Sequence, residues 1–156
     1  MQKVKEKQNW QIASEIELIY KTKVKASQRP HIGSASSVYK LALKIWDPGK
    51  IEFLEQFKVF LLDRSNKVLG IFEISSGGTT GACVDLKLLF VAALKTNATG
   101  IIIIHNHPSG KTLPSLADKL ITKKIKEAGT ILDIVLVDHL IITSESYFSF
   151  ADNAIL

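Results

Sequence analysis

The sequence predicts an α/β fold in which helices flank a mixed β-sheet, and three features of the chain support this prediction. Segments with apolar residues at helical spacing alternate with short apolar runs typical of strands. Two of these runs are separated by only a few polar residues, as in a hairpin. A third run, Ile101 to Ile104, has no polar alternation, which is typical of a strand buried on both faces.

The chain has 156 residues, the size of one domain. Residues 1–33 are expected to form an N-terminal strand and a connection that belong to, or pack on, a domain spanning residues 34–156. From Trp10 to Tyr20 most apolar residues fall on even positions, and a period of two is typical of a half-buried strand. The polar segment from Lys21 to Gly33 is expected to be the connection.

A first helix and a hairpin are expected to follow. Either Ser34 or Ser36 can cap the helix, which is expected to end at Asp47. The apolar residues at helical spacing in this helix are Val38, Leu41, Ala42 and Ile45. The two strands of the hairpin are predicted from Phe57 to Asp63 and from Val68 to Ser75.

Two further helices and two strands complete the expected fold. Asp85 is predicted to cap the second helix, and the third is predicted from Leu116 to Ala128 with Gly129 as its stop. The predicted inner faces of these helices are Leu88, Leu89, Ala92 and Ala93 in the second, and Leu116, Leu120, Ile121 and Ile125 in the third. The last strands are expected from Ile134 to Thr143 and from Tyr147 to Phe150.

The net charge of +5 permits contact with nucleic acid. Lysines cluster near the start of the chain and within the third predicted helix, but such runs are more often solvated faces. No nucleic-acid-binding motif with interleaved aromatic residues stands out. Nucleic acid is therefore a secondary candidate partner.

The sequence predicts a cytoplasmic protein without membrane contact. No apolar run approaches the ~18 residues of a membrane-spanning helix, and the charged start lacks the apolar region of a secretory signal. The single cysteine, Cys83, cannot form an internal disulfide, and we expect a small buried residue there rather than a nucleophile.

The segment most informative about function is His105-Asn106-His107-Pro108, at the end of the buried strand. Residues i and i+2 of a strand project to the same face, so His105 and His107 are expected to converge while Asn106 faces away. Pro108 cannot continue a central strand, which places the pair at the end of the strand. The next helix starts after a short loop and can deliver Asp118 from its first turn.

Two imidazoles and one carboxylate are the ligand set of a catalytic zinc site, which leaves its fourth position to water. Zinc lowers the pKa of such a water, and a carboxylate is then needed to receive its proton. We therefore predict one Zn²⁺ per chain on His105, His107 and Asp118, although manganese, iron or nickel could use the same ligands. Ser115 and Asp118 also match a capping box, a role that is compatible with metal binding.

This pattern resembles the signature of the JAMM (MPN+) metallopeptidases. The matching features are His105-x-His107-Pro108, the ten residues between His107 and Asp118, and Ser115 three residues before Asp118. The resemblance implies a JAB/MPN, cytidine-deaminase-like fold and a zinc ion on the two histidines and the aspartate. It also implies that Ser115 helps to stabilise a tetrahedral intermediate.

The downstream sequence is similar to the RadC branch of this fold, from roughly Phe57 to the C-terminus. The residues that carry this similarity are His105-Asn-His-Pro-Ser-Gly110, Pro114-Ser115 and Asp138-His139. RadC proteins carry a DNA-repair label, and longer members have an N-terminal helix-hairpin-helix region. We expect no such region within residues 1–33, and this expectation makes direct DNA binding a weaker prediction.

The resemblance further implies that a glutamate on an earlier element is the general base. Glu55, just before the strand that starts at Phe57, best matches that position, and Glu52 and Glu73 are alternatives. Family members with this site cleave amide bonds, including isopeptide bonds to ubiquitin-like tails. The expected function is therefore a zinc-dependent metallohydrolase whose substrate is a peptide or an isopeptide-linked protein.

Two other functions stay open: a DNA-repair-associated accessory protein with a non-catalytic metal site, and a protein-interaction module that lost its activity. The intact ligand set favours the hydrolase over the interaction module. Asp138 and His139, inside an apolar strand, are either a satisfied buried pair or support for the metal site, and His31 is expected to be ordinary surface.

Overall fold

A five-stranded mixed β-sheet forms the centre of the computed structural model, which describes Glu17, residues 19–77 and residues 84–156. The strands lie in the order β2-β1-β3-β4-β5. Their bounds are β1 (Gln56–Leu62), β2 (Val68–Ser76), β3 (Gly100–Asn106), β4 (Val135–Ile142) and β5 (Tyr147–Ser149). Strands β3 and β4 pair in parallel and the other neighbours pair antiparallel, so the predicted mixed sheet and its β1–β2 hairpin are confirmed.

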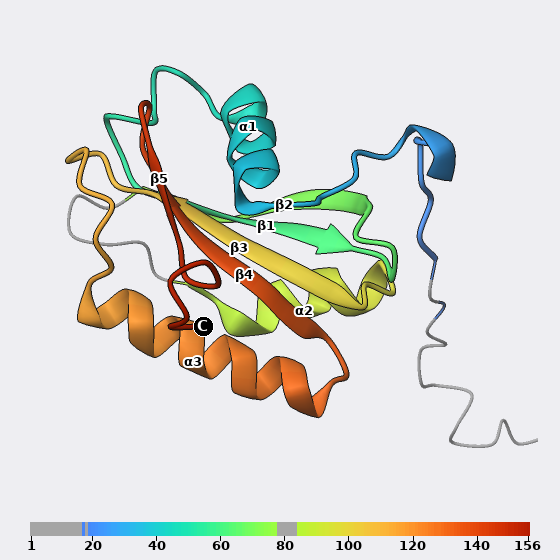
Figure 1. Ribbon diagram of the computed structural model, residues 1–156. Coiled ribbons are helices and arrows are strands. Elements are labelled where there is room, and N and C mark those ends of the chain that lie inside the picture. The colour runs from blue at the N-terminus through green and yellow to red at the C-terminus, as the bar shows by residue number, and fades with distance from the viewer. Residues whose placement is uncertain (1–16, 18, 78–83) are drawn as a thin grey trace, which may run out of the picture.

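Within the described part of the chain, three α-helices cover the two faces of this sheet (Figure 1). One face is covered by α1 (Ala35–Ile45), and the other by α2 (Leu86–Lys95) and α3 (Leu116–Ile131). The predicted α/β class is therefore confirmed. Among the described residues, no helix is both long and apolar enough to cross a membrane.

The sheet separates two hydrophobic cores, which makes its central strand apolar on both sides. In β3, Ile102 and Ile104 pack in the core under α1, while Ile101 and Ile103 pack in the core under α2 and α3. All residues of β3 are buried, as its unbroken apolar run predicted. His105 continues the second series and therefore points to the face that α2 and α3 cover.

Side-chain caps set the start of each α-helix. Ser34, one of the two predicted caps, accepts a hydrogen bond from the backbone of Ser37 at the start of α1. Asp85 caps α2 through the backbone N–H of Leu88, and Ser115 caps α3. These residues satisfy N–H groups that have no partner within the helix, which explains why the boundaries were predictable.

The predicted inner faces of the helices were only partly right. In α2, Leu88 is 46% exposed and Phe90 is buried instead. In α3, Leu116 and Leu120 are 74% and 53% exposed. Ile45 of α1 is also exposed, because it lies in the last turn. The buried face of α3 consists of Asp118, Thr122, Ile125 and Gly129, so polar residues rather than leucines face inward at its start.

Gly129 does not stop α3, which continues to Ile131. A Cβ at this position would lie 2.4 Å from the carbonyl oxygen of Ile134. The glycine therefore permits the chain entering β4 to approach the helix, and Ile134 donates its N–H to the Gly129 carbonyl at 2.8 Å. The sequence signal reflected close packing rather than termination.

The strand predicted from Trp10 to Tyr20 lies almost entirely outside the described residues. Tyr20, which is described, donates its hydroxyl to the Leu69 carbonyl of β2 at 2.6 Å. Further along, His31 is exposed and forms an isolated β-bridge with Lys67. This part of the connection therefore contacts the β1–β2 hairpin.

Candidate metal centre

His105 and His107 lie at the carboxyl end of β3 with their Nε2 atoms 3.0 Å apart. The strand ladder ends at Asn106, and the His107 N–H donates to the Ile142 carbonyl of β4, which holds the first residue beyond the strand. His105 is fully buried, whereas the side chain of His107 is 17% exposed. The strand geometry therefore brings the two rings together, with one of them open to solvent.

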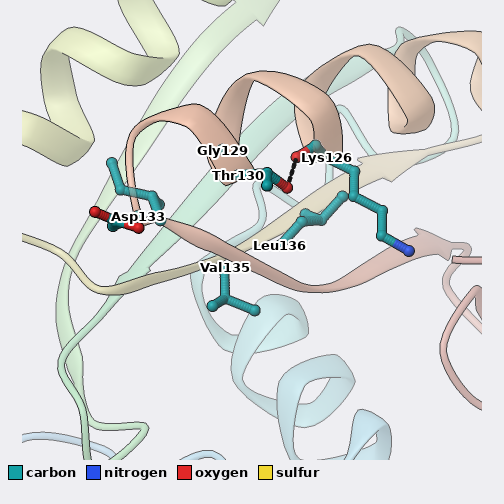
Figure 2. Close-up of a pocket in the computed structure, with 7 residues that line it drawn as sticks. Lys126, Gly129, Thr130, Asp133, Val135 and Leu136 are labelled. Atoms are coloured by element: carbon teal, nitrogen blue, oxygen red, sulfur yellow. Dashed lines mark hydrogen bonds between the residues drawn. The ribbon is translucent and has the colours of Figure 1, made fainter.

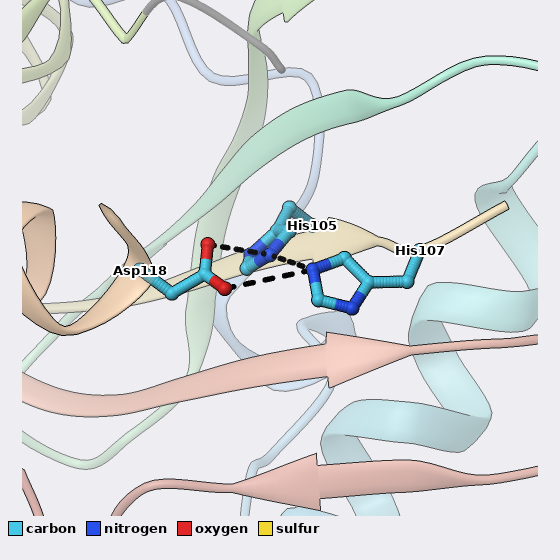
Figure 3. A group of neighbouring side chains, drawn as sticks. All are labelled: His105, His107 and Asp118. Carbon is cyan, nitrogen blue, oxygen red and sulfur yellow. Dashed lines mark hydrogen bonds and ion pairs between the residues drawn. The ribbon is translucent and has the colours of Figure 1, made fainter. Parts of the chain in front are cut away.

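Asp118 reaches the same point from the first turn of α3 (Figure 3). Its Oδ1 lies 3.2 Å from His105 Nε2, and its Oδ2 lies 3.6 Å from His107 Nε2. Among the described residues, these three offer ligand atoms that all lie within 4.8 Å of one another, and they could hold a metal ion. The predicted convergence of His105, His107 and Asp118 is thus present.

The separations fit a tetrahedral ion. A zinc ion about 2 Å from each ligand atom places those atoms about 3.3 Å apart. The 3.0 Å between the two histidine Nε2 atoms and the 3.2 Å from His105 Nε2 to Asp118 Oδ1 lie close to that separation. The 3.6 Å from His107 Nε2 runs to the other carboxylate oxygen, Oδ2. His107 Nδ1 donates to the Lys111 carbonyl at 2.7 Å, because a carbonyl can only accept, so Nε2 carries the lone pair when this ring is neutral. The ligand atoms are therefore suitably spaced for a cation between them.

Ser115 holds Asp118 in place through a reciprocal capping box. The Ser115 hydroxyl and backbone N–H both donate to Asp118 Oδ2, at 2.6 and 2.7 Å, and the Asp118 N–H donates to the hydroxyl oxygen at 3.1 Å. Capping and presentation of the carboxylate are thus the same set of contacts. One carboxylate oxygen, Oδ1, is left facing His105.

The charges of the cluster depend on one another. Burial alone would raise the pKa of Asp118, but hydrogen bonds from His105 and His107 outweigh it and hold that pKa well below its usual range. The hydrogen bond to Asp118 raises the pKa of His107, against the effect of burial. The Lys111 carbonyl and the negative charge of Glu55 also raise it. In the absence of a metal, the neighbouring carboxylate therefore favours the protonated form of His107.

The three candidate general bases lie in different surroundings. Glu55 is half-buried and immediately precedes β1, and its negative charge contributes to the raised pKa of His107. Glu73 lies beside Lys58 across the β1–β2 pair and forms an ion pair with it. Lys58 is paired in turn with Ile104, whose side chain belongs to the α1 core, so Glu73 points to the face opposite His105. Glu52, the third candidate, accepts a hydrogen bond from Ser144 at the surface.

Asn106 fixes the loop that carries Glu55, a role that sequence reasoning missed. Its Nδ2 donates to the carbonyls of Ile51 and Leu54 at 2.8 and 2.9 Å, and its Oδ1 accepts from the Gln56 N–H at 2.7 Å. The side chain is buried on the face opposite the histidines. A buried amide with all these contacts ties the segment before β1 to the metal-binding strand.

His139 and Thr122 extend the cluster into the core. His139 Nε2 lies 2.8 Å from His105 Nδ1, and His139 Nδ1 lies 2.6 Å from Thr122 Oγ1. Burial, with the nearby His105, holds the pKa of His139 well below its usual range. Sequence reasoning missed Thr122, although its place one turn after Asp118 puts it on the same helix face.

Asp138 is satisfied away from the metal site. It accepts hydrogen bonds from the Ser149 hydroxyl at 2.6 Å and from the Ala151 N–H at 3.0 Å. Burial raises its pKa against the effect of these contacts. Within the Asp138-His139 dipeptide, only the histidine contacts the site. Cys83 lies outside the described residues.

A pocket of about 300 Å³ lies at the other end of α3 (Figure 2). It is bounded by the last turns of the helix and the start of β4, and Lys126 is about 12 Å along the helix axis from Asp118. Two of its polar side chains are engaged: Thr130 donates to the Lys126 carbonyl and Lys126 Nζ donates to the Leu156 carbonyl, both at 2.9 Å. The pocket is separate from the metal cluster.

Comparison with known proteins agrees with this geometry. The family described as "RadC-like JAB domain" matches residues 32–155. A UPF0758 protein of Flavobacterium johnsoniae is 54% identical over 65% of this chain and 44% of its own length. UPF0758 proteins of Chlorobaculum parvum and Clostridium perfringens are 33% and 38% identical over 94% and 98% of this chain, and over 64% and 66% of their own lengths. The chain thus spans about half to two thirds of these relatives, and it belongs to the RadC-like JAB domain family.

Proposed function

We propose that this domain is a zinc-dependent hydrolase that cleaves an amide or isopeptide bond. The observation that carries the proposal is the convergence of two imidazole nitrogens and one carboxylate at the end of a buried strand. Two neutral histidines with lone pairs 3.0 Å apart would repel each other unless a cation or a proton lay between them. The donor set of two nitrogens and one oxygen suits zinc and leaves room for a fourth ligand.

Zinc would be held by His105 and His107 through Nε2 and by Asp118 through its carboxylate. When bound, zinc would supply a Lewis acid that lowers the pKa of water and polarises a carbonyl. Asp118 is oriented for this role by Ser115, which engages Oδ2. The partial exposure of His107 supports access for a substrate from that side of the cluster.

Glu55 would act as the general base. It would take a proton from the attacking water and return it to the leaving amine, because cleavage of an amide requires that nitrogen to be protonated. The geometric support over Glu73 is that the hydrogen bonds of Asn106 tie the loop of Glu55 to the strand that carries the histidines, and the negative charge of Glu55 contributes to the raised pKa of His107. Glu73 is instead paired with Lys58.

Ser115 would stabilise the negative oxygen of the tetrahedral intermediate. Its hydroxyl has one proton, which is donated to Asp118 Oδ2 in the structure. The proposed role therefore requires the hydroxyl to turn from the carboxylate to the developing oxyanion. The backbone N–H of Ser115 would then keep its hydrogen bond to Asp118.

A polypeptide substrate is what the JAMM resemblance implies, and exposed apolar residues near Ser115 in the sequence agree with it. Leu113 and Leu116, on either side of Ser115 in the sequence, are 78% and 74% exposed. An extended chain lying beside Ser115 would find these apolar side chains available for contact. This favours a peptide or an isopeptide-linked protein over a small polar substrate.

The first experiment is metal analysis of untagged protein by elemental mass spectrometry, with a His105→Ala/His107→Ala variant as the matched control. The proposal predicts about one zinc per chain in the wild type and none in the variant. Hydrolysis would then be assayed with a peptide library and with a ubiquitin-like protein joined through an isopeptide bond to a lysine peptide. Absence of metal from both proteins after zinc is added back would overturn the proposal.

A further inference from the structure

Three buried hydrogen bonds connect a metal-ligand candidate to the backbone of α3. His105 Nδ1 contacts His139 Nε2 at 2.8 Å, and His139 Nδ1 contacts Thr122 Oγ1 at 2.6 Å. Thr122 Oγ1 in turn contacts the backbone carbonyl of Asp118 at 2.5 Å. His105 and His139 are fully buried and Thr122 is nearly so, so water does not compete for these contacts.

The direction of each hydrogen bond follows from its carbonyl end. The Asp118 carbonyl can only accept, so the single hydroxyl proton of Thr122 points to it. Thr122 Oγ1 must then accept from His139, which places a proton on His139 Nδ1. Neutral His139 consequently has its lone pair on Nε2, where it accepts from His105 Nδ1–H. His105 is left with Nε2 as its metal-binding atom.

We propose that Thr122 and His139 are positioning residues that hold His105 in the tautomer whose Nε2 is free to bind a metal ion. Histidine ligands generally donate their second N–H to a carboxylate, a carbonyl or water. Here the acceptor for the His105 Nδ1–H is the neutral ring of His139. The direction of the hydrogen bonds is set by the Asp118 carbonyl of α3 at the other end of the chain of contacts. This inference rests on the metal site of the proposed function and is independent of hydrolysis.

Aromatic contacts keep the rings in the required planes. His139 stacks on Phe150 with ring centroids 4.4 Å apart and planes inclined by 15°. His105 stacks on Phe57 at 5.6 Å and 7°. The two rings therefore have little freedom to rotate, and the hydrogen bonds select between tautomers of a fixed geometry.

The helix joins this arrangement to the third ligand. Thr122 lies one turn after Asp118, and its hydroxyl contacts the carbonyl of that same residue. The turn of α3 that presents the Asp118 carboxylate therefore also sets the proton position on His105. A small rotation of the helix would disturb two metal-ligand candidates together.

The test compares isosteric substitutions by their zinc affinity, measured in competition with a chromogenic chelator. Thr122→Val keeps the shape but removes the hydroxyl, and zinc affinity is expected to fall about tenfold. Thr122→Ser keeps the hydroxyl and is expected to remain within about twofold of the wild type. His139→Phe is expected to weaken binding by about 10- to 100-fold, and His139→Gln, which can place an oxygen near the Nε2 position, is expected to recover most of it.

A second measurement, made on the wild type, tests the inference even if the variants fail to fold. Long-range ¹H–¹⁵N NMR of the wild-type histidine rings reports which nitrogen carries a proton, with or without zinc. The inference predicts that His139 carries a proton on Nδ1 and none on Nε2, which accepts the hydrogen bond from His105. A proton on His139 Nε2, or wild-type zinc affinity in Thr122→Val, would overturn it, as would equal losses in Thr122→Val and Thr122→Ser. A protein that binds no zinc would refute the proposed function, while the ring protons would still decide this inference.

Discussion

Two polar clusters lie on opposite faces of the sheet, where the start of β1 pairs with the end of β3. They differ in how the negative charge of their carboxylate is balanced. On the α1 face, Lys58 and Glu73 form an ion pair, Gln56 donates to the same carboxylate at 3.0 Å, and Lys58 Nζ lies 4.8 Å from the centre of the Trp46 ring. The carboxylate there has a cation supplied by the chain itself. The side chain of Lys58 is only 10% exposed, so this charge needs its partner.

On the α3 face, Asp118 meets two histidines and no lysine or arginine among its described partners. In the metal-free protein, hydrogen bonds from the histidines hold the pKa of Asp118 low, and the hydrogen bond to Asp118 raises the pKa of His107. A carboxylate that is paired with a lysine of the chain needs no further cation. A carboxylate that lies beside two imidazole nitrogens is suited to binding an added metal ion. The two clusters should therefore respond differently to substitution and to zinc.

Asp118→Asn should have the largest effect on metal binding. Asparagine keeps the size and a side-chain oxygen that can accept from Ser115, the N-cap of α3, but it removes the negative charge beside the histidines. Zinc affinity is expected to fall by more than about a hundredfold, beyond the loss for a residue that only supports a ligand. Isothermal titration with zinc checks this, and circular dichroism controls for folding. Unchanged affinity would show that the cation is not bound by Asp118.

Glu55→Gln should separate metal binding from chemistry. Zinc content is expected to be unchanged, because Glu55 is not among the clustered ligand atoms. Hydrolysis is expected to fall by about 10²- to 10⁴-fold through loss of the general base. Glu73→Gln is the matched control, and should keep its activity because Glu73 lies on the opposite face. If the two variants exchanged these behaviours, the base would be Glu73.

Lys58→Met tests the cluster on the α1 face. Methionine preserves much of the apolar stem but leaves Glu73 without its cation, and the free energy of unfolding is expected to fall by about 1–2 kcal/mol. The loss stays below that of a fully buried pair because the Glu73 side chain is 41% exposed. Zinc affinity should not change. Urea denaturation with and without zinc distinguishes this outcome from a coupling between the two faces.

The sequence predicted those parts of the site that depend on local geometry. The i, i+2 spacing on a strand brings His105 and His107 together, and a capped helix start presents Asp118. The spacing of apolar residues in α3 gave a wrong prediction, because it assigned Leu116 and Leu120 to the buried face of the helix. The helix is instead turned so that its first polar residues meet the histidines.

The rest of the site depends on pairing between distant strands, which local spacing does not encode. Parallel pairing of β3 with β4 sets His139 opposite Ile103, on the same face as His105. Antiparallel pairing of β1 with β2 sets Glu73 opposite Lys58, on the other face. A shift of one residue in either register would exchange these faces. The sequence alone therefore did not decide whether His139 supports the metal site or whether Glu73 is the general base.

The pH dependence of stability gives the smallest predicted effect and distinguishes a shared proton from a metal ion at the α3 face. The pKa of His107 is raised by folding, so in the metal-free protein its contribution is fully present below about pH 6.5 and is lost as pH rises through the folded value. The pKa of Asp118 is lowered, so its contribution is lost only on acidification below about pH 4.

With zinc bound, the first of these trends should reverse. Zinc competes with the proton on His107, so its affinity and the stability that it adds are expected to increase as pH rises above about 6.5. Thermal unfolding between pH 6 and 8, with zinc or with a chelator, checks both slopes. His107→Gln is the control, since it removes the titrating ring and should flatten the metal-free slope. If the metal-free protein instead gained stability across this range, a proton shared by Asp118 and His107 would not be what balances the cluster, and the comparison with Lys58 and Glu73 would fail.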